Sequence, residues 1–339
     1  MSLPRILRDG DVKLGLGGAP LGNLYAAVTD SAANAVIEAA YAGGIRYFDT
    51  APHYGQGLSE RRFGAALRGC PRRDYQISTK VGRILEAAPS APRAQHGYVD
   101  VPPLFTRYDY TAAGIERSLA DSCTRLGMDR VDIVYVHDLD PATHGEEFTR
   151  HFADLIDSGL PGLLRLKAAG AIGAVGIGVN GVDIALKTLR AAPLDVLLLA
   201  GRYTLADTTA LAILLPECAR RDVDVVLGGV FNAGILATGT IPADGSAPMF
   251  DYAPATPEVI AQVAAIEALC AKHTVALPAA ALQFTTAHPG IDITLIGVRS
   301  VEELTACLAW QNRPIPLAFW RDLRRSGQVD AAAPLPGLH

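Results

Sequence analysis

Charged and aromatic residues are scarce in this sequence. Asp, Glu, Lys and Arg make up 19% of the 339 residues, and Phe, Trp and Tyr make up 6%. The formal net charge is −5, and the scattered Lys and Arg form no basic stripe. Such a stripe is what a nucleic-acid backbone or an anionic membrane surface binds, so neither partner is expected. The expected partners are small molecules, and the sequence indicates no oligomeric state.

Long apolar runs and paired cysteines are also lacking. No run reaches the ~20 apolar residues that span a bilayer, and residues 1–11 have no apolar stretch like that of a signal peptide. We therefore expect a cytoplasmic protein. The cysteines are widely spaced, without a CxxC pair, and are expected to be small helix-face residues rather than disulfides, metal ligands or nucleophiles. They are Cys70, Cys123, Cys218, Cys270 and Cys307.

Apolar residues make up half of the composition and recur in short runs with few interior charges. Such runs are typical of parallel strands that are buried on both faces. The runs are "VKLGLGG", "IRYFDTA", "YQISTKVG", "VDIVYVHD", "AIGAVGIGV", "DVLLLAG", "VDVVLGGV" and "DITLIGV".

Stretches with helical periodicity follow these runs. A strand followed by a helix, repeated eight times, predicts an α/β fold of the (β/α)8 TIM-barrel type, with a doubly wound sheet as the alternative. No linker or low-complexity segment divides the chain, so residues 1–339 are expected to form a single barrel domain. The predicted helices are residues 31–42, 59–67, 109–126, 160–169, 182–191, 208–220, 257–273 and 301–309.

Three irregular segments exceed the length of simple connections: residues 82–108, 138–159 and 231–256. Each follows a predicted strand. In a barrel, the loops after the strands form the face that carries the active site, so these segments are expected to surround it.

Four polar residues fall at the ends of predicted strands or directly after them. Asp49 ends the second strand, and Tyr54 follows in a turn rich in Pro and Gly. Lys80 ends the third strand and His137 the fourth. A lysine within an otherwise apolar strand needs a partner, because a buried unpaired ammonium is costly.

This set can act as a proton-transfer device. A phenol is a poor base at neutral pH, but a neighbouring ammonium lowers its pKa, so Lys80 is expected to lower the pKa of Tyr54. Asp49 would hold the ammonium, and His137 would orient the reacting oxygen. Each residue also has a purely structural interpretation: a buried ion pair for Asp49 and Lys80, and ordinary hydrogen bonding for Tyr54 and His137.

Taken together, the motifs resemble the aldo-keto reductase superfamily. The resemblance rests on "FDTAPHYGQGLSE", "ISTKVG" and "LGMDRVDIVYVHD", in that order, and extends from "LGLGGAPLG" to "IGVRSVEEL". It implies a barrel that transfers hydride between NAD or NADP and a carbonyl or carbinol carbon, without metal. It also implies that Tyr54 is the general acid/base, that Lys80 and Asp49 tune it, and that His137 orients the substrate.

For the cofactor, the resemblance implies residues after the fifth, seventh and eighth strands. Three positions depart from the family pattern: Val179, Ala200 and Leu227 replace a serine, a glutamine and an aromatic residue that contact nicotinamide. Phe231 is expected to replace the aromatic residue. The candidate cofactor residues are Asn180, Phe231, Asn232, Gly297, Arg299, Ser300 and Glu303, and the candidate substrate residues are His53 and Phe105.

The segments "LLAGRYTL" and "GGVFN" resemble those of a subgroup of sugar and pyridoxal dehydrogenases. That resemblance implies oxidation of the anomeric carbon of an aldose, such as L-fucose or D-arabinose, to the lactone. Oxidation of the hemiacetal of pyridoxal and general reduction of aldehydes or ketones are the alternatives.

Ser300 and Glu303 have the S-x-x-E spacing of a capping box at a helix N-terminus. A helix N-terminus after the eighth strand of a barrel also binds phosphate. Arg299 could pair with a 2′-phosphate, whereas Glu302 or Glu303 could accept ribose hydroxyls, so NAD and NADP both remain open.

Three further alternatives depend on the same residues. The segment "HDLDPATH" holds four residues of metal-ligating types, but its expected loop geometry favours no metal. A Schiff-base lyase would use Lys80 as its nucleophile. A non-catalytic dinucleotide-binding regulator would tolerate a damaged set of catalytic residues, whereas all four are present here.

Overall fold

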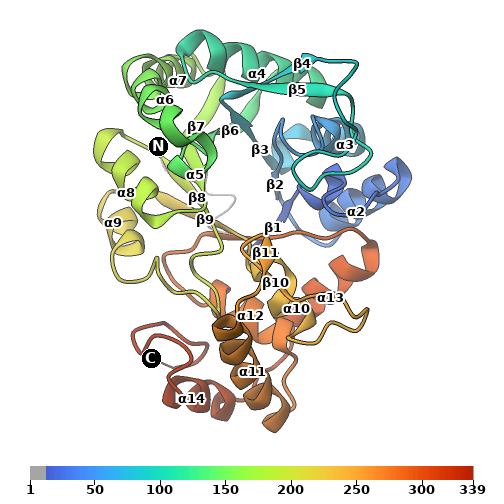
Figure 1. Cartoon of the computed structure of the whole chain (residues 1–339), viewed down its shortest axis with the longest axis vertical. Coiled ribbons are helices and arrows are strands. Elements are labelled where there is room, and N and C mark those ends of the chain that lie inside the picture. Colours follow the sequence, from blue (N-terminus) through green and yellow to red (C-terminus); the bar gives the residue numbers. More distant parts are fainter. Residues whose placement is uncertain (1–12, 339) are drawn as a thin grey trace.

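Eight parallel strands form a closed barrel in the computed structural model, which describes residues 13–338 (Figure 1). Around the ring they are β1 (Leu14–Gly17), β2 (Tyr47–Asp49), β3 (Gln76–Val81), β6 (Val131–His137), β7 (Ile172–Val179), β8 (Val196–Ala200), β9 (Asp224–Gly228) and β12 (Ile293–Ile296).

Strand β1 pairs with both β2 and β12, which closes the ring. Each strand lies within one of the eight predicted runs, so the barrel prediction is confirmed and the doubly wound alternative is wrong. The expectations about residues 1–11 lie outside the described residues.

The barrel interior is a packed core, as is usual for this architecture. Two tyrosines, Tyr47 and Tyr135, lie in it with apolar side chains from β6, β7, β8, β9 and β12, and their hydroxyls are 2.8 Å apart. Glycines make room for both rings. A Cβ at Gly15 would lie 2.9 Å from the Tyr47 ring, and a Cβ at Gly176 would lie 2.8 Å from the Tyr135 ring.

Helices surround the barrel (Figure 1). The layer contains α2 (Asp30–Ala42), α3 (Leu58–Leu67), α4 (Ala112–Leu126), α7 (Leu160–Ala168), α8 (Val182–Ala191), α9 (Leu214–Arg220), α12 (Leu277–Thr286) and α13 (Val301–Asn312). Two more helices, α11 (Pro257–Lys272) and α14 (Leu317–Arg325), pack against each other, and α11 also packs on α12.

The helix predictions differ from the structure at α9, α12 and α14. Helices α12 and α14 were not predicted, and α12, rather than the predicted helix at 257–273, packs on β12. Nearly all of α12 is buried and apolar, so it has no amphipathic stripe to reveal it. The helix predicted at 208–220 begins only at Leu214. Its first residues form a turn instead, because the Asp207 carboxylate accepts hydrogen bonds from the amide and hydroxyl of Thr209.

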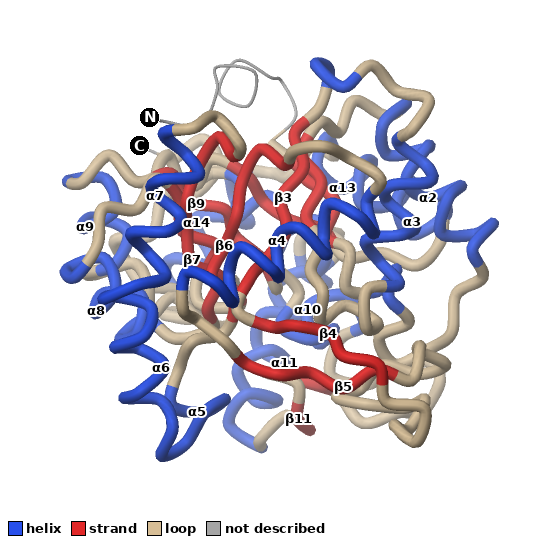
Figure 2. Tube along the Cα trace, turned by 90° about the horizontal axis from the view of Figure 1, so that it is seen from above, coloured by secondary structure: helices blue, strands red, loops and turns tan. Residues whose placement is uncertain are grey.

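The three long segments contain small elements of their own. An antiparallel pair, β4 (Arg83–Ala87) and β5 (Leu104–Tyr108), lies in the first, and a second pair, β10 (Met249–Phe250) and β11 (Ala253–Pro254), lies in the third after α10 (Ile235–Thr238). The second segment is largely helical, with α5 (Pro141–His144), α6 (Phe148–Asp154) and a π-helical turn at Leu155–Gly159. Figure 2 shows β4, β5, β11 and α5 at one end of the barrel.

No single helix among residues 13–338 is long and apolar enough to cross a membrane. Helices α11 and α12 meet that test only as a pair, and they are bent by 102° at the break between them.

Candidate active site

A buried ion pair lies at the carboxyl ends of β2 and β3. Lys80 Nζ is 2.6 Å from Asp49 Oδ2 and donates a second hydrogen bond, of 3.0 Å, to the carbonyl of Thr50. The Asp49 and Lys80 side chains are 2% and 1% exposed. The ammonium is therefore held by two acceptors and shielded from solvent, which leaves it poorly placed to attack a carbonyl as a Schiff-base nucleophile.

The ring of Tyr54 covers this ion pair. Lys80 Nζ lies 4.4 Å from the ring centroid, within cation–π range. The Tyr54 backbone is fixed by a close approach to the turn Pro20–Gly22, where a Cβ at Gly22 would lie 2.7 Å from the carbonyl oxygen of Tyr54. The turn residues noted in the sequence therefore place the phenol over Lys80.

His137 completes the set from β6. Its ring meets the ring of Tyr54 edge-on at 5.8 Å, and it is 5% exposed. Its Nδ1 is buried without a hydrogen-bond partner in the described structure. An unpartnered buried nitrogen next to Tyr54 is suited to a hydrogen bond with a bound molecule. The structure thus brings together all four residues predicted at the strand ends.

Burial sets the protonation states of this set. Burial, followed by the charge of Asp49, raises the pKa of Tyr54 well above its ordinary value. This direction is opposite to the lowering expected from Lys80, because loss of water outweighs the ammonium. Burial, with Arg83 and Lys80, lowers the pKa of His137 well below its usual value. At neutral pH the phenol is therefore protonated and the imidazole neutral.

A hydrogen-bond chain that was not predicted from the sequence supports Asp49 from inside the barrel. The hydroxyl of Ser78 donates to Asp49 Oδ1 at 2.7 Å, and the hydroxyl of Tyr47 donates to Ser78 Oγ at 3.1 Å. Ser78 precedes Lys80 by two residues on the same strand, so both side chains point to the same face. That period-two spacing was the available signal.

A second, partly buried ion pair borders His137. Arg83, on β4, is 2.7 Å from Asp138 Oδ2, and its guanidinium lies 5.3 Å from the ring centroid of Tyr108. Asp138 has a left-handed backbone with φ of 42°. Arg83 belongs to the segment 82–108, which was expected to surround the active site. Its charge is neutralised by Asp138, whose Oδ2 also lies 3.3 Å from His137 Nε2.

The "HDLDPATH" segment is used for other contacts. Asp138 pairs with Arg83, Asp140 caps α5 by accepting the amide of Thr143, and His144 Nε2 lies 2.8 Å from the hydroxyl of Tyr110. Within residues 13–338 no group of three or more His, Cys, Asp or Glu residues could hold a metal ion.

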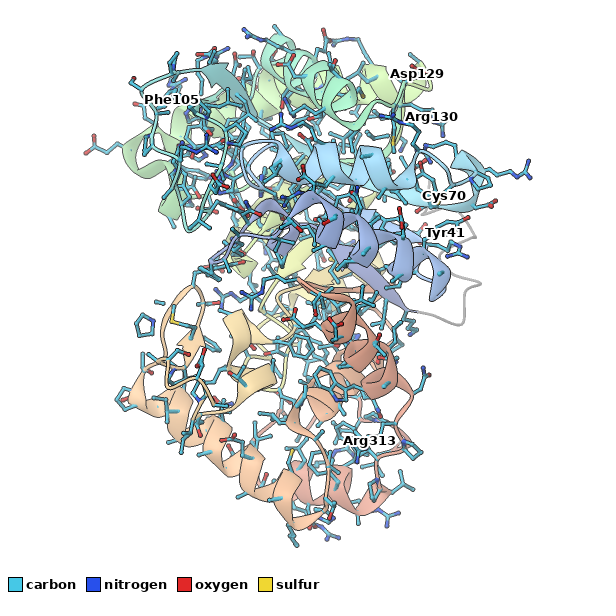
Figure 3. The ribbon with its side chains drawn as sticks, turned by 90° about the vertical axis from the view of Figure 1, so that its right-hand side faces the viewer. Tyr41, Cys70, Phe105, Asp129, Arg130 and Arg313 are labelled. Carbon is cyan, nitrogen blue, oxygen red and sulfur yellow. The ribbon has the colours of Figure 1, made fainter. Side chains whose placement is uncertain are left out.

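The two predicted substrate residues lie in different places. The ring of His53 is 5.9 Å from that of His137, with its Nδ1 buried and unpartnered. Phe105 is 59% exposed and lies at the edge of the molecule in Figure 3, while the adjacent Thr106 is buried. The structure therefore brings His53, but not Phe105, next to His137.

Ser300 is the N-cap of α13 as the predicted capping box requires, but the Glu303 carboxylate bonds the amide of Arg299 instead of that of Ser300. Ser300 Oγ accepts the amide of Glu303 at 3.2 Å, and Glu303 Oε2 accepts the amide of Arg299 at 2.7 Å. The Arg299 side chain is 45% exposed, and its Nε lies 4.0 Å from the Glu303 carboxylate. A Cβ at Gly297 would lie 3.0 Å from Pro20, so this glycine allows close packing beside the capped helix.

The other candidate cofactor residues contact neighbouring loops. The Asn180 amide lies 3.5 Å from Asp138 Oδ1, and the Asn180 carbonyl accepts a hydrogen bond from Arg202. Asn232 is buried, with its amide bonded to the Gly201 carbonyl and the Thr204 hydroxyl. The Phe231 ring packs edge-on against Trp310 of α13 at 6.4 Å.

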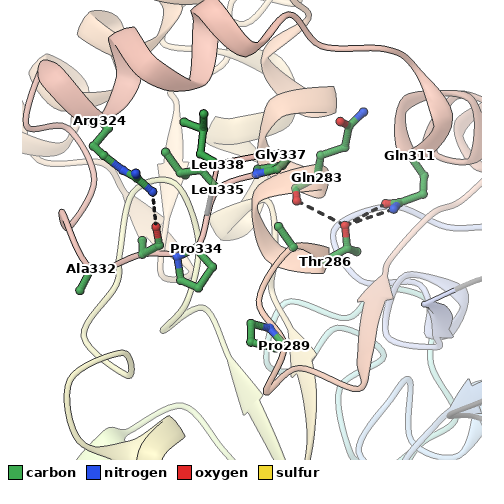
Figure 4. Close-up of a pocket in the computed structure, with 13 residues that line it drawn as sticks. Gln283, Thr286, Pro289, Gln311, Arg324, Ala332, Pro334, Leu335, Gly337 and Leu338 are labelled. Atoms are coloured by element: carbon green, nitrogen blue, oxygen red, sulfur yellow. Dashed lines mark hydrogen bonds between the residues drawn. The ribbon is translucent and has the colours of Figure 1, made fainter.

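An open pocket of about 710 Å³ lies away from these residues (Figure 4). It is lined by the end of α12, by Pro289 and by residues 332–338, and Arg324 donates a hydrogen bond across it to Ala333. Because α12 ends just before β12 begins, the pocket lies at the amino-terminal end of the barrel, opposite the catalytic set.

The family model described as the Aldo/keto reductase family matches residues 13–326. The chain belongs to this family. Pyridoxal 4-dehydrogenase from Microbacterium luteolum is 40% identical to this aldo/keto reductase over 326 residues, or 93% of the chain and 94% of the relative. D-threo-aldose 1-dehydrogenase from a Pseudomonas species is 38% identical over 91% of the chain and 92% of the relative. The fold matches that of an aldo-keto reductase from Bacillus halodurans with a TM-score of 0.71 at 22% identity, over 95% and 93% of the chains.

Family membership makes this aldo/keto reductase an NAD(P)-dependent oxidoreductase. The residues after β12 fit the anionic end of the dinucleotide. The start of the twelve-residue helix α13 carries partial positive charge, and the exposed guanidinium of Arg299 lies beside it.

Proposed function

We propose that the chain oxidises the anomeric carbon of a free aldose, such as L-fucose, to the lactone, with Tyr54 as the general acid/base. The carrying observation is the buried set in which Asp49 fixes Lys80, Lys80 lies under the Tyr54 ring, and His137 meets that ring edge-on. The aldose 1-dehydrogenase among the relatives supports the substrate class.

The proposed reaction is the oxidation of a cyclic hemiacetal, which loses one proton and one hydride. The C1 hydroxyl loses its proton, the C1–H bond breaks as hydride leaves, and a C1=O bond forms. Bound NAD or NADP supplies the hydride acceptor, and its reduced form is the second product. Arg299, Ser300 and Glu303, with Asn180, Phe231, Asn232 and Gly297, are the residues we propose to hold it.

The proton path uses groups of this chain. The oxygen of the substrate lies between the Tyr54 hydroxyl and the ring of His137, which is neutral and offers one N–H. In the reductive direction the protonated phenol donates to the forming alkoxide. In the oxidative direction the phenolate takes the proton of the C1 hydroxyl, so oxidation is favoured by rising pH.

Pyridoxal is the second candidate substrate, because the pyridoxal 4-dehydrogenase is 40% identical over nearly the whole chain. Its hemiacetal presents a ring carbon bearing hydroxyl and hydrogen, as an aldose does. The same four catalytic residues would therefore serve both substrates.

The proposal is tested with the purified chain, L-fucose, D-arabinose or pyridoxal, and NAD or NADP, by following absorbance of the reduced cofactor. Tyr54→Phe should lower turnover by about 10²–10⁴ while leaving dinucleotide affinity unchanged. Tyr41→Phe is the matched control and should retain activity. Tyr41 lies on α2, and the substitution removes a hydroxyl that donates a hydrogen bond to Asp74. Near wild-type turnover of Tyr54→Phe would refute this role for the phenol.

A further inference from the structure

Asp138 contacts three side chains at the carboxyl end of β6. Its Oδ2 lies 2.7 Å from the guanidinium of Arg83 and 3.3 Å from His137 Nε2. Its Oδ1 lies 3.5 Å from the amide nitrogen of Asn180, which follows β7. Asp138 therefore lies between the histidine proposed to orient the reacting oxygen and a residue proposed to hold the dinucleotide.

A left-handed backbone places this carboxylate beside His137. Consecutive residues of a strand point to opposite faces, so an extended Asp138 would point away from His137. Asp138 instead has φ of 42°, and its amide donates to the carbonyl of Gly178 at 2.9 Å. Residues other than glycine rarely adopt this conformation, and those that do concentrate at functional sites. The turn thus brings a carboxylate to the imidazole, which a regular strand would not do.

The Asp138 carboxylate selects the tautomer of His137. A negative oxygen 3.3 Å from Nε2 favours an N–H at that atom over a lone pair. Burial lowers the pKa of His137 well below its usual value, so the imidazole is neutral and carries a single N–H. A substrate oxygen that accepts this N–H is therefore held next to the carboxylate.

Asp138 keeps acceptor capacity for a ligand. An ionised carboxylate offers about four acceptor positions, and of its three contacts only the one to Arg83, at 2.7 Å, is short. The Asp138 side chain is 19% exposed, whereas the Arg83 side chain is 5% exposed. The guanidinium is therefore a buried countercharge, and the carboxylate is the accessible member of the pair.

Buried nitrogen atoms without partners gather around this pair. In the described structure, Arg83 Nε, His137 Nδ1 and His53 Nδ1 have no hydrogen-bond partner. The rings of the two histidines are 5.9 Å apart. Buried polar atoms are nearly always paired, so three of them together indicate a site built for a polar ligand. A molecule with several hydroxyl groups supplies both donors and acceptors to such a set.

We propose that Asp138 accepts a hydrogen bond from the hydroxyl on C2, the carbon next to the one that is oxidised. When the oxygen on C1 accepts the N–H of His137 Nε2, the adjoining hydroxyl comes within reach of a carboxylate that lies 3.3 Å from Nε2. The Arg83–Asp138 pair thereby selects aldoses that carry the C2 hydroxyl over 2-deoxy sugars and simple aldehydes. This inference rests on the proposed function and names the substrate class that the same site takes.

Two sugars that differ only in this hydroxyl test the assignment, because 2-deoxy-D-ribose is D-arabinose without its C2 hydroxyl. The wild-type chain should oxidise D-arabinose with a kcat/KM at least about tenfold higher, since the deoxy sugar lacks a charge-assisted hydrogen bond. Asp138→Ala should bring the two values of kcat/KM within about threefold of each other. The change should come from a higher KM for D-arabinose, with little change in the kinetics of 2-deoxy-D-ribose.

A second variant and a control separate recognition from folding. Asp138→Ala leaves the buried Arg83 cation unpaired, so the double variant with Arg83→Met repeats the test in a neutral site. It should show the same loss of discrimination. Asp140→Ala is the matched control, because it removes the next carboxylate of the loop, which accepts the amide of Thr143 at 2.7 Å and caps α5. This variant should keep the wild-type ratio.

Equal kcat/KM of the wild-type chain for the two sugars would overturn the assignment of Asp138 and leave the proposed function intact. The wild-type ratio in Asp138→Ala and in the double variant would do the same. A wild-type chain that oxidises neither these sugars nor L-fucose would overturn both the assignment and the proposed oxidation of an aldose.

Discussion

The hydroxyl of Ser78 holds one oxygen of Asp49 at 2.7 Å, while Lys80, two residues further along β3, holds the other at 2.6 Å. The carboxylate is thus fixed at both oxygens by one strand. Behind Ser78, the hydroxyls of Tyr47 and Tyr135 extend the chain of hydrogen bonds into the barrel interior. Hydrogen bonds therefore join the barrel interior to the Asp49–Lys80 ion pair.

Removing this hydroxyl should disturb the site. Ser78→Ala should lower the free energy of unfolding by about 1–3 kcal/mol, because a buried carboxylate loses a donor. It should also lower kcat while changing KM less. The reason is that Asp49, without its bond from Ser78, holds Lys80 less firmly. Thr294→Val is the matched control: this side chain is fully buried on β12, and its hydroxyl has no partner in the described structure. Urea denaturation and steady-state kinetics give both readouts. Equal effects of the two substitutions would contradict the positioning role.

The Asp49–Lys80 pair should show strong coupling. Lys80→Met should lower the free energy of unfolding by about 3–5 kcal/mol, because it leaves a buried carboxylate unpaired. The double variant Asp49→Asn with Lys80→Met should recover much of this loss. A double-mutant cycle in urea measures the coupling. Strictly additive losses would show that the two groups do not stabilise each other.

Arg299 should discriminate between the two dinucleotides. If its exposed guanidinium pairs with a 2′-phosphate, Arg299→Ala should weaken NADP binding by roughly 1.5–3 kcal/mol and leave NAD nearly unchanged. Glu303→Gln should strengthen NADP binding, because it removes a negative charge and keeps an acceptor for the Arg299 amide. Quenching of tryptophan fluorescence, with Trp310 on the same helix, reports both affinities. Equal losses for NAD and NADP would remove the arginine from phosphate recognition.

Acidification should destabilise the fold through its buried neutral histidines. The pKa of His53 is lowered by burial to about 2, from an ordinary value near 6.5. As pH falls, His53 therefore binds a proton in the unfolded chain before it does so in the folded chain. The free energy of unfolding is unaffected by this group above pH ~6.5. Below that pH it falls by up to about 1.4 kcal/mol per pH unit. His53→Asn should reduce the slope of unfolding free energy against pH between about 6.5 and 4.5. An unchanged slope would show that His53 is protonated in the folded chain.

The strand ends show how far the sequence determined the site. Asp49, Lys80 and His137 could be placed because buried parallel strands are continuous apolar runs, and a polar residue at the end of such a run is conspicuous. Ser78 lies two residues before Lys80, so the alternation of side chains along β3 places it on the same face as Lys80. It was not predicted, because a serine within an apolar strand is less conspicuous than a lysine. Helix α12 was missed for the opposite reason, since it is apolar on nearly all sides.

Only the tertiary structure decided the remaining features. The direction of the pKa shift of Tyr54 depends on how much water its neighbours exclude, which no spacing in the sequence encodes. Tyr47 and Tyr135 are 88 residues apart in the chain, and only the closed barrel places their hydroxyls 2.8 Å from each other. The sequence determined the barrel and the strand-end positions of Asp49, Lys80 and His137, because periodicity and chain order are local properties. The pairing of Arg83 with Asp138 is a contact between distant segments, and folding alone creates it.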